Sequence, residues 1–372
     1  MKNFIKREFP LIVAVFTGAA FFFFGNRWLA DLSDLALDGV MFIWLFCVIV
    51  LGAIWIVRHA DVLAIKLGEP YGTLILTLSV ASLEIMAVAV VMLTGTENPT
   101  LARDTMFSVV MIALNGLVGF GLLVGGWLYH EQGYNLRGVN AYLGVIISLA
   151  IVGMVLPNFT TSTAGPTFSS KQAGFLIAMC TGLYAVFLAI QTTRHREYFV
   201  QPEVVEGSIV TELNKPRSHP DLRSVPYHAG LLLGYLIIII YLVENFAILL
   251  NHGLDVLHAP PALGALLVAV LVLAPEGLGA IESALKNHLQ RSVNILLGSV
   301  LATLALTIPS VLIIGLAKGI NIVLGISGVD QVMLLLTLLV STVTFASGHT
   351  NVLQGAVHLM LFLAYLMLIF WG

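Results

Sequence analysis

The chain of 372 residues is strongly apolar and carries few charges. Hydrophobic residues make up 59% of it, charged residues make up 10%, and the mean hydropathy is +0.98. This balance excludes an ordinary soluble domain and indicates an integral membrane protein. The net charge of −3 comes without a basic stripe that could follow phosphates, so we expect the lipid bilayer and no nucleic acid as partner.

Apolar runs long enough to cross a bilayer recur along the whole chain. About 20 apolar residues span the roughly 30 Å of hydrocarbon. The runs are continuous rather than alternating, which favours helices over a barrel and predicts an all-α integral membrane protein with about 11 transmembrane helices. The predicted spans lie near 9–30, 38–57, 70–94, 104–128, 139–157, 171–193, 228–250, 261–285, 292–317, 329–346 and 350–371.

One long polar stretch divides these spans into six and five. We interpret it as a cytoplasmic linker that is dispensable for transport itself, because it is rich in charge and proline. The expected organisation is an N-terminal transmembrane helix in 1–33, a first five-helix repeat in 34–193, the linker in 194–227 and a second five-helix repeat in 228–372.

The distribution of basic residues predicts the orientation. With the N-terminus in the cytoplasm, thirteen of the 17 Lys and Arg residues lie on the inner side. Cytoplasmic loops normally carry this excess of positive charge. An odd number of spans then places the C-terminus outside, in a multi-pass protein of the inner (cytoplasmic) membrane. The four basic residues on the outer side are Arg27, Arg103, Lys171 and Lys318.

Two glutamates stand inside otherwise apolar spans, Glu84 in VASLEIMAV and Glu276 in VLAPEGLGA. A charged side chain at the bilayer centre costs roughly 2.5 to 3.5 kcal/mol on insertion scales, so it is seldom retained without an ion, proton or donor. Each repeat contains five helices, which is an odd number, so equivalent helices of the two repeats cross the membrane in opposite directions. The spans with Glu84 and Glu276 are such a pair. This pattern is typical of inverted-topology repeats, here spans 2–6 against spans 7–11, and it predicts a shared cation and proton site at Glu84 and Glu276.

Other residues of the glutamate spans suggest local features. Pro275 removes a helical hydrogen bond next to Glu276, so we expect the helix to be interrupted there. At 100° per residue, Thr73 and Thr77 share a face with Glu84, and Ser283 shares one with Glu276. These polar faces indicate a water-filled vestibule towards the cytoplasm, or else hydroxyls that bond to their own helices.

Four segments resemble the bacterial ChaA-type calcium/proton (sodium/proton) antiporters of the calcium:cation antiporter superfamily. The resemblance implies a core of two inverted five-helix repeats, in which one acidic residue from each repeat coordinates the cation and takes up protons. Glu84 and Glu276 match those positions, while Gln191 and Asn351 resemble pathway positions or have a packing role. The first repeat departs from the pattern, with Val-Ala-Ser-Leu-Glu where cation/proton exchangers commonly have Gly-Asn-x-x-Glu. The segments are APEGLGAIESALKNHLQRSVNILLGSVLATLALTIP at 274–309, GEPYGTLILTLSVASLE at 68–84, QTTRHREYF at 191–199 and SGHTNVLQGAVHL at 347–359.

The physics of a carboxylate pair fits ion exchange. Two carboxylates about 5 Å apart repel by roughly 3 kcal/mol at an effective dielectric constant near 20. A cation relieves this repulsion and so do protons, which makes the two kinds of binding mutually exclusive. The predicted function is a secondary active antiporter that exchanges Ca²⁺ for H⁺ without a cofactor. The alternative is a Na⁺(K⁺)/H⁺ antiporter on the same scaffold.

A calcium ion takes six to eight oxygen ligands, which is more than two side chains supply. Backbone carbonyls and the side chains of Asn115, Asn294, Ser299 and Thr303 are therefore candidate ligands or pathway residues. The same residue types also bridge neighbouring membrane helices, and the sequence leaves both roles open.

Two other classes of function fit the sequence less well. A cation channel usually gathers its acidic groups from several subunits or from filter loops, whereas this chain builds a pseudo-symmetric pair within itself. An enzyme is disfavoured because the ten histidines form no H-x-x-x-H or H-E-x-x-H motif. The physiological cation and the oligomeric state stay open.

Overall fold

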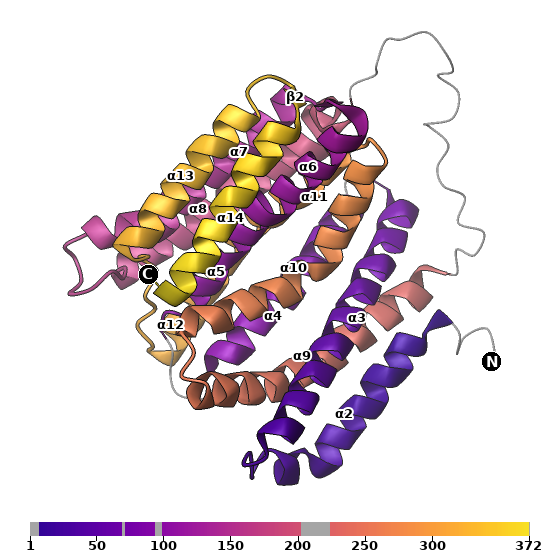
Figure 1. The fold of residues 1–372 in the computed structure, drawn as a ribbon, viewed down its shortest axis with the longest axis vertical. Coiled ribbons are helices and arrows are strands. Elements are labelled where there is room, and N and C mark those ends of the chain that lie inside the picture. The colour runs from indigo at the N-terminus through magenta and orange to yellow at the C-terminus, as the bar shows by residue number, and fades with distance from the viewer. Residues whose placement is uncertain (1–6, 69–70, 94–98, 202–223, 372) are drawn as a thin grey trace.

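The computed structural model describes residues 7–68, 71–93, 99–201 and 224–371. These residues form a bundle of helices with one short pair of strands (Figure 1). In the first half, the elements are α2 (Phe9–Trp28), α3 (Leu35–Leu67), α4 (Tyr71–Leu93), α5 (Leu101–Met111), η1 (Ile112–Leu117), α6 (Val118–Tyr129), β1 (Gln132–Gly133), α7 (Leu136–Ala150), η2 (Ile151–Val155), η3 (Leu156–Phe159), α8 (Ser170–Ala189), η4 (Ile190–Arg194) and η5 (Arg196–Phe199). In the second half, they are α9 (Val225–Val256), α10 (Pro261–Leu285), α11 (Leu289–Ala302), η6 (Thr303–Thr307), α12 (Ile308–Lys318), α13 (Gly328–Thr344), β2 (His349–Thr350) and α14 (Val352–Trp371).

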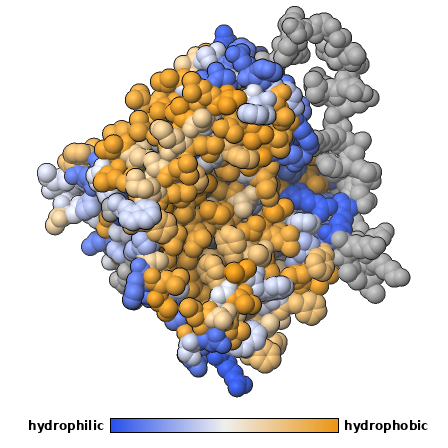
Figure 2. Space-filling model, viewed as in Figure 1, coloured by the Kyte–Doolittle hydropathy of each residue, from blue (hydrophilic) through white to orange (hydrophobic). Residues whose placement is uncertain are grey.

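The helices account for the predicted membrane spans. Within the described residues, nine helices are long and apolar enough to cross a membrane, and Thr77–Leu93 and Gly328–Thr344 are shorter apolar helices. Figure 2 shows one face of the molecule that is mostly hydrophobic, with hydrophilic residues gathered towards its edges. The prediction of an all-α, multi-pass membrane protein is confirmed.

Helices α3 and α9 are longer than the sequence predicted. Helix α3 has 33 residues and begins after Asp34, whose carboxylate accepts hydrogen bonds from the N–H groups of Ala36 and Leu37. It continues beyond its apolar run through His59, so a search for apolar residues finds only part of it. The two long helices pack along each other, and α2 lies beside them at the outside of the bundle (Figure 1).

The predicted interruption at Pro275 is wrong. Helix α10 runs unbroken from Pro261 to Leu285 with Pro275 inside it. A proline removes one backbone donor, and the packing of α10 against α3, α5 and α11 keeps the helix continuous around that loss. The irregular turns lie elsewhere. The described residues include the wide π-helical turns η1, η2, η4 and η6, of which η1 and η6 interrupt the predicted spans near 104–128 and 292–317. Such turns are frequent at functional sites.

Glycine permits a close approach between α6 and α14. A Cβ atom on Gly355 would lie 2.4 Å from the backbone nitrogen of Leu123, and one on Gly119 would lie 2.9 Å from that of Leu359. At one end of these helices, β1 and β2 form an antiparallel pair in which Gln132 is opposite Thr350. This contact ties the two repeats together.

The predicted linker 194–227 is described only at its ends. Its first residues continue the chain through η4 and η5, and α9 begins at Val225. Residues 202–223 lie outside the described residues. We call the face of the bundle where α8 ends and α9 begins the linker side.

Candidate functional site: two glutamates joined by a stripe of hydroxyls

The helices that carry the two glutamates lie against the wide turns of the opposite repeats. Glu84 is in the middle of α4 and Glu276 is in the middle of α10. Helix α4 contacts η6, and helix α10 contacts η1. The inverted arrangement thus brings each carboxylate helix to an irregular turn near the centre of the bundle.

Glu84 is buried and fully engaged by hydroxyl groups. Its side chain is 3% exposed. Its Oε2 accepts a hydrogen bond from Thr303 Oγ1 at 2.8 Å, and its Oε1 accepts one from Thr307 Oγ1 at 3.2 Å. A buried carboxylate needs such donors, because leaving it without them costs the full desolvation of the charge. The two threonines of η6 therefore hold the orientation of Glu84.

Glu276 is held by the helical segment that also holds Glu84, the segment formed by α11 and η6. Its Oε2 accepts a hydrogen bond from the hydroxyl of Ser299 in α11. Ser299, Thr303 and Thr307 follow one another at intervals of four residues, so they share one face of the continuous segment α11–η6. We call these three residues the hydroxyl stripe. The stripe thus contacts both carboxylates from one face of a single helical segment.

A cavity of about 330 Å³ lies beside both glutamates. It is lined by Glu84, Glu276 and Ser299 at its inner end, and by Asp61 and Arg291 near the linker-side ends of α3 and α11. The cavity therefore extends from the carboxylates towards the linker side. Its walls are more apolar than charged, which strengthens the electrostatic interactions of the few polar groups it contains.

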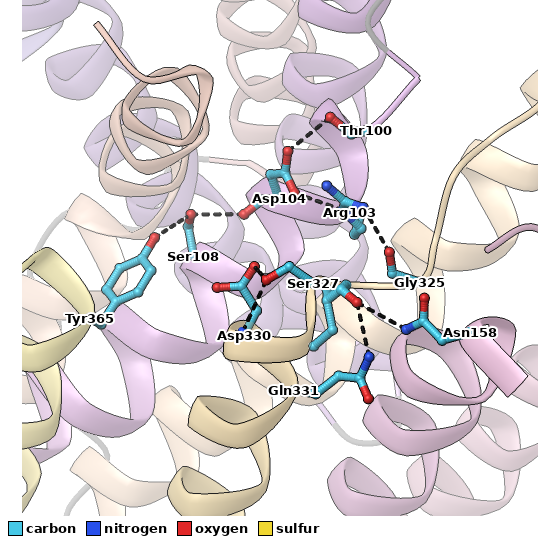
Figure 3. A network of polar contacts seen from close by, with 11 residues as sticks. Thr100, Arg103, Asp104, Ser108, Asn158, Gly325, Ser327, Asp330, Gln331 and Tyr365 are labelled. Atoms are coloured by element: carbon cyan, nitrogen blue, oxygen red, sulfur yellow. Dashed lines mark hydrogen bonds and ion pairs between the residues drawn. The ribbon is translucent and has the colours of Figure 1, made fainter. Parts of the chain in front are cut away.

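The segment between α12 and α13 that comprises residues 320–327, which we call the strap, lies at the opposite end of the bundle. Figure 3 shows Arg103 and Asn158 reaching this segment from two directions. Arg103 Nη1 donates to the carbonyl of Gly325 at 2.7 Å, and Asn158 Nδ2 donates to that of Ile326 at 2.9 Å. Backbone N–H groups of the strap also donate to carbonyls of Pro99, Pro166 and Met154. These contacts tie the strap to the first repeat.

The structure brings most of the predicted site residues together. Thr303 contacts Glu84 directly, as described above. Gln191 donates a hydrogen bond to the hydroxyl of Tyr142 at 2.8 Å, and the side-chain amide of Asn294 donates to the carbonyl of Phe199. The predicted residues that line the cavity are Glu84, Glu276, Thr77, Gln191, Asn294 and Ser299.

Three predicted residues lie elsewhere. Asn115 in η1 donates to Thr337 Oγ1 at 2.8 Å and lies 3.2 Å from the ring of His358, so it joins helices. Ser283 bonds to the carbonyl of Gly279 in its own helix, which is the alternative that the sequence left open. Asn351 is exposed and accepts the backbone N–H of Leu353 at the start of α14. The side chain of Thr73 is outside the described residues.

The sequence analysis missed Thr307. Its signal was the four-residue spacing from Ser299 through Thr303, which continues to Thr307. This spacing was not distinctive, because serine and threonine hydroxyls in membrane helices commonly bond to the backbone of their own helix.

The serine of the first repeat that corresponds in position to Ser299 has different partners. Ser108 precedes η1 by four residues, as Ser299 precedes η6. Ser108 Oγ lies 2.7 Å from the hydroxyl of Tyr365 and donates to the carbonyl of Asp104 (Figure 3). Ser299, in contrast, donates to Glu276. The described hydroxyl donors to both carboxylates therefore come from one repeat, and the pseudo-symmetry of the site is broken.

The family described as "Sodium/calcium exchanger protein" matches residues 38–193 and 227–371 of the chain. The chain belongs to this family. Helix α2 and residues 194–226 lie outside the match. The sodium/calcium exchanger family consists of transport proteins, so the prediction of a transporter rather than an enzyme is confirmed.

Relatives within the family differ in the ions that they are named for. The chain is 42% identical over 316 residues to the "Sodium-potassium/proton antiporter ChaA" of Escherichia coli (strain K12), covering 85% of this chain and 84% of the relative. It is 25% identical over 272 residues to a "Ca(2+)/H(+) antiporter" of Synechocystis sp., covering 68% of this chain and 72% of the relative. The resemblance to ChaA-type antiporters is therefore confirmed.

Solved structures confirm the fold. The structure of native YfkE matches with a TM-score of 0.73 at 18% sequence identity, over 97% of this chain and 100% of that one. The H⁺/Ca²⁺ exchanger CAX matches with a TM-score of 0.64 at 16% identity, over 95% of this chain and 88% of that one. The predicted arrangement of inverted repeats is that of these family members.

Proposed function

We propose that the protein is a cation/proton antiporter in which Glu84 and Glu276 alternately hold the transported cation and protons. The observation that carries this proposal is the hydroxyl stripe, which contacts both carboxylates beside one cavity. Mutual repulsion makes the empty, doubly charged pair unfavourable. A cation or protons neutralise it, and binding one kind of ligand displaces the other. This competition provides the coupling that exchange requires.

Calcium is the cation that the geometry suits. Two carboxylates match its charge, and each hydroxyl of the stripe has lone pairs that it can turn towards an ion. The oxygens of Glu84, Glu276, Ser299, Thr303 and Thr307 together approach the number that Ca²⁺ requires. Sodium or potassium is the second candidate, because the E. coli relative is named for those ions at 42% identity.

We propose the cytoplasmic membrane as the location, with the linker side in the cytoplasm. Thirteen of the 17 Lys and Arg residues then lie on the cytoplasmic side, as is usual for membrane proteins. In this orientation the cavity faces the cytoplasm and the strap faces outward.

Transport by the purified protein in sealed vesicles tests the function and the choice of ion. The vesicles contain a pH-sensitive dye and an acidic interior, and Ca²⁺, Na⁺ and K⁺ are added separately outside. An antiporter raises the internal pH when a transported cation is added, and we expect Ca²⁺ to do so. A response to Na⁺ or K⁺ alone selects the second candidate. Cation flux without proton movement contradicts antiport and supports a channel.

The competition between cation and protons predicts a specific dependence on pH. Above about pH 6.5, lowering the pH on the cavity side raises the apparent KM for the cation, by up to about tenfold per pH unit for one competing proton, while the rate at saturating cation is retained. Initial rates at several cation concentrations measure both quantities. A KM that stays constant between about pH 6 and 9, with exchange still proton-coupled, means that another group carries the proton. Glu244 and Glu282 are then the next residues to test.

A further inference from the structure

Two histidines form a buried contact on the linker side. His59 of α3 is 1% exposed and His228 of α9 is 2% exposed. Their Nδ1 atoms lie 2.9 Å apart. On its other side, His59 Nε2 lies 3.3 Å from Oε2 of Glu8, which is fully buried and immediately precedes α2. Glu8, His59 and His228 therefore connect α2, α3 and α9.

The contact between the two Nδ1 atoms limits how many protons the two rings can hold. A hydrogen bond between two Nδ1 atoms needs one ring as donor and the other as acceptor. When His59 donates its Nε2 proton to Glu8, its Nδ1 either accepts a proton from His228 or donates one to it. One further proton can be held, for example at Nε2 of His228, but when both rings are imidazolium ions two N–H groups lie face to face across 2.9 Å. Full protonation is therefore incompatible with the contact.

The surrounding charges add to this effect. Two imidazolium ions next to each other repel, and a buried pair of like charges is poorly screened. Glu8 supplies one negative charge, while the basic neighbours supply more than one positive charge. The charged and titratable groups that act on the histidines or on Glu8 are Arg7, Arg58, Lys66, Tyr227 and Tyr235.

The helix that carries His59 also forms part of the wall of the glutamate cavity. Val57 and Asp61, each two residues from His59 on α3, line that cavity. Helices α3 and α9 pack along each other, so separating His59 from His228 shifts the cavity wall that α3 provides. A change of protonation at the histidines can thus reach the transport site without contact with the glutamates.

We propose that Glu8, His59 and His228 form a proton-operated clamp that joins α2, α3 and α9 at neutral and alkaline pH and opens when the linker side becomes acidic. Opening lowers the turnover of the transporter. This effect on turnover rests on the proposed antiport function, whereas the effect on stability does not.

The direction of the pH dependence follows from proton linkage. The closed clamp excludes the proton that would make both rings imidazolium ions, and the opened clamp accepts that proton at the ordinary histidine pKa of about 6.5. Acid therefore favours the opened form. Below about pH 6.5, each further pH unit shifts the ratio of closed to opened forms roughly tenfold towards the opened form.

The test compares His228→Gln and His59→Gln with the wild type and with a control variant, His252→Gln. His252 is on the same helix as His228 and lies 3.7 Å from Asp38, outside the clamp. The maximal exchange rate at saturating cation is measured in everted membrane vesicles as the external pH falls from about 7.5 to about 5. The midpoint of thermal unfolding is measured for the purified full chain over the same range.

We expect the wild type and His252→Gln to lose about tenfold in maximal rate per pH unit once the clamp opens, together with a lower midpoint of unfolding. Both clamp variants should lose less than about twofold, since Gln does not titrate. An acid response that is identical in all four proteins overturns the proposal. If His228→Gln does not fold, His59→Gln tests the same contact from α3.

The two measurements separate the clamp from the glutamate site. Competition at Glu84 and Glu276 raises KM and is overcome by saturating cation, whereas the clamp acts on the maximal rate. If the wild type shows no cation/proton exchange, the proposed function fails. The pH dependence of the unfolding midpoint then still decides whether the clamp exists.

Discussion

Glu276→Gln abolishes proton-coupled exchange, and Glu84→Gln does the same. Glutamine preserves the volume of the side chain and its ability to bond with Ser299 or with Thr303. It removes the negative charge, which both the cation and the proton need for binding. We expect exchange in vesicles to fall to the level of protein-free vesicles, with normal expression and normal thermal unfolding.

Glu282→Gln is the matched control for these variants. Glu282 is on the same helix as Glu276, but it is largely exposed and pairs with Lys286 four residues later. An exposed pair of this kind contributes little to stability, so its loss should leave exchange unchanged. Near-normal exchange by a correctly folded Glu276→Gln or Glu84→Gln variant removes that residue from the proposed site.

Replacing both threonines of η6 by valine should weaken cation binding strongly. In the Thr303→Val/Thr307→Val variant, Glu84 loses the donors to both of its carboxylate oxygens while the side-chain volume is nearly unchanged. Hydrogen bonds to charged groups contribute about 1.5 to 3 kcal/mol each, which is roughly tenfold or more in affinity. We expect the apparent KM for the cation to rise at least about tenfold for each single variant and further for the double variant.

The kinetic readout separates this positioning role from a structural one. Thr342→Val is the control, because Thr342 is exposed and its hydroxyl donates to the carbonyl of Leu338 in its own helix. It should leave KM unchanged. Ser rescues each threonine position if the hydroxyl is what matters. A double valine variant with wild-type KM and the same pH dependence would show that the hydroxyls do not hold Glu84 for cation binding.

Much of the fold follows from one-dimensional properties of the chain. The number of spans and their helical nature come from the length of apolar runs, because a bilayer requires every backbone polar group to be bonded within the segment. The inverted repeat follows from counting spans between Glu84 and Glu276. Both glutamates were visible because a carboxylate is rare in an apolar span. These inferences need no knowledge of which helices touch.

The wide turns and the path of α10 depended on packing. Pro275 predicts a broken helix on local grounds, yet the neighbours of α10 keep it continuous. Gly116 lies in η1 and Pro309 follows η6, but glycine and proline also occur in regular helix, as Gly121 does in α6 and Pro275 in α10. A π-helical turn changes the direction of several side chains at once, and it persists only where surrounding helices favour it.

The sequence by itself determined the class of protein and the number and inversion of its spans, and it singled out two acidic residues within them, because these features depend on composition and on counting along the chain. Only the tertiary structure decided which polar residues meet those acids. Ser299, Thr303 and Thr307 reach both carboxylates, whereas Asn115 turns away towards Thr337 and His358. The contact of His59 with His228 joins residues 169 positions apart. Such contacts depend on how helices pack and rotate against one another, so the periodicity of a single helix does not predict them.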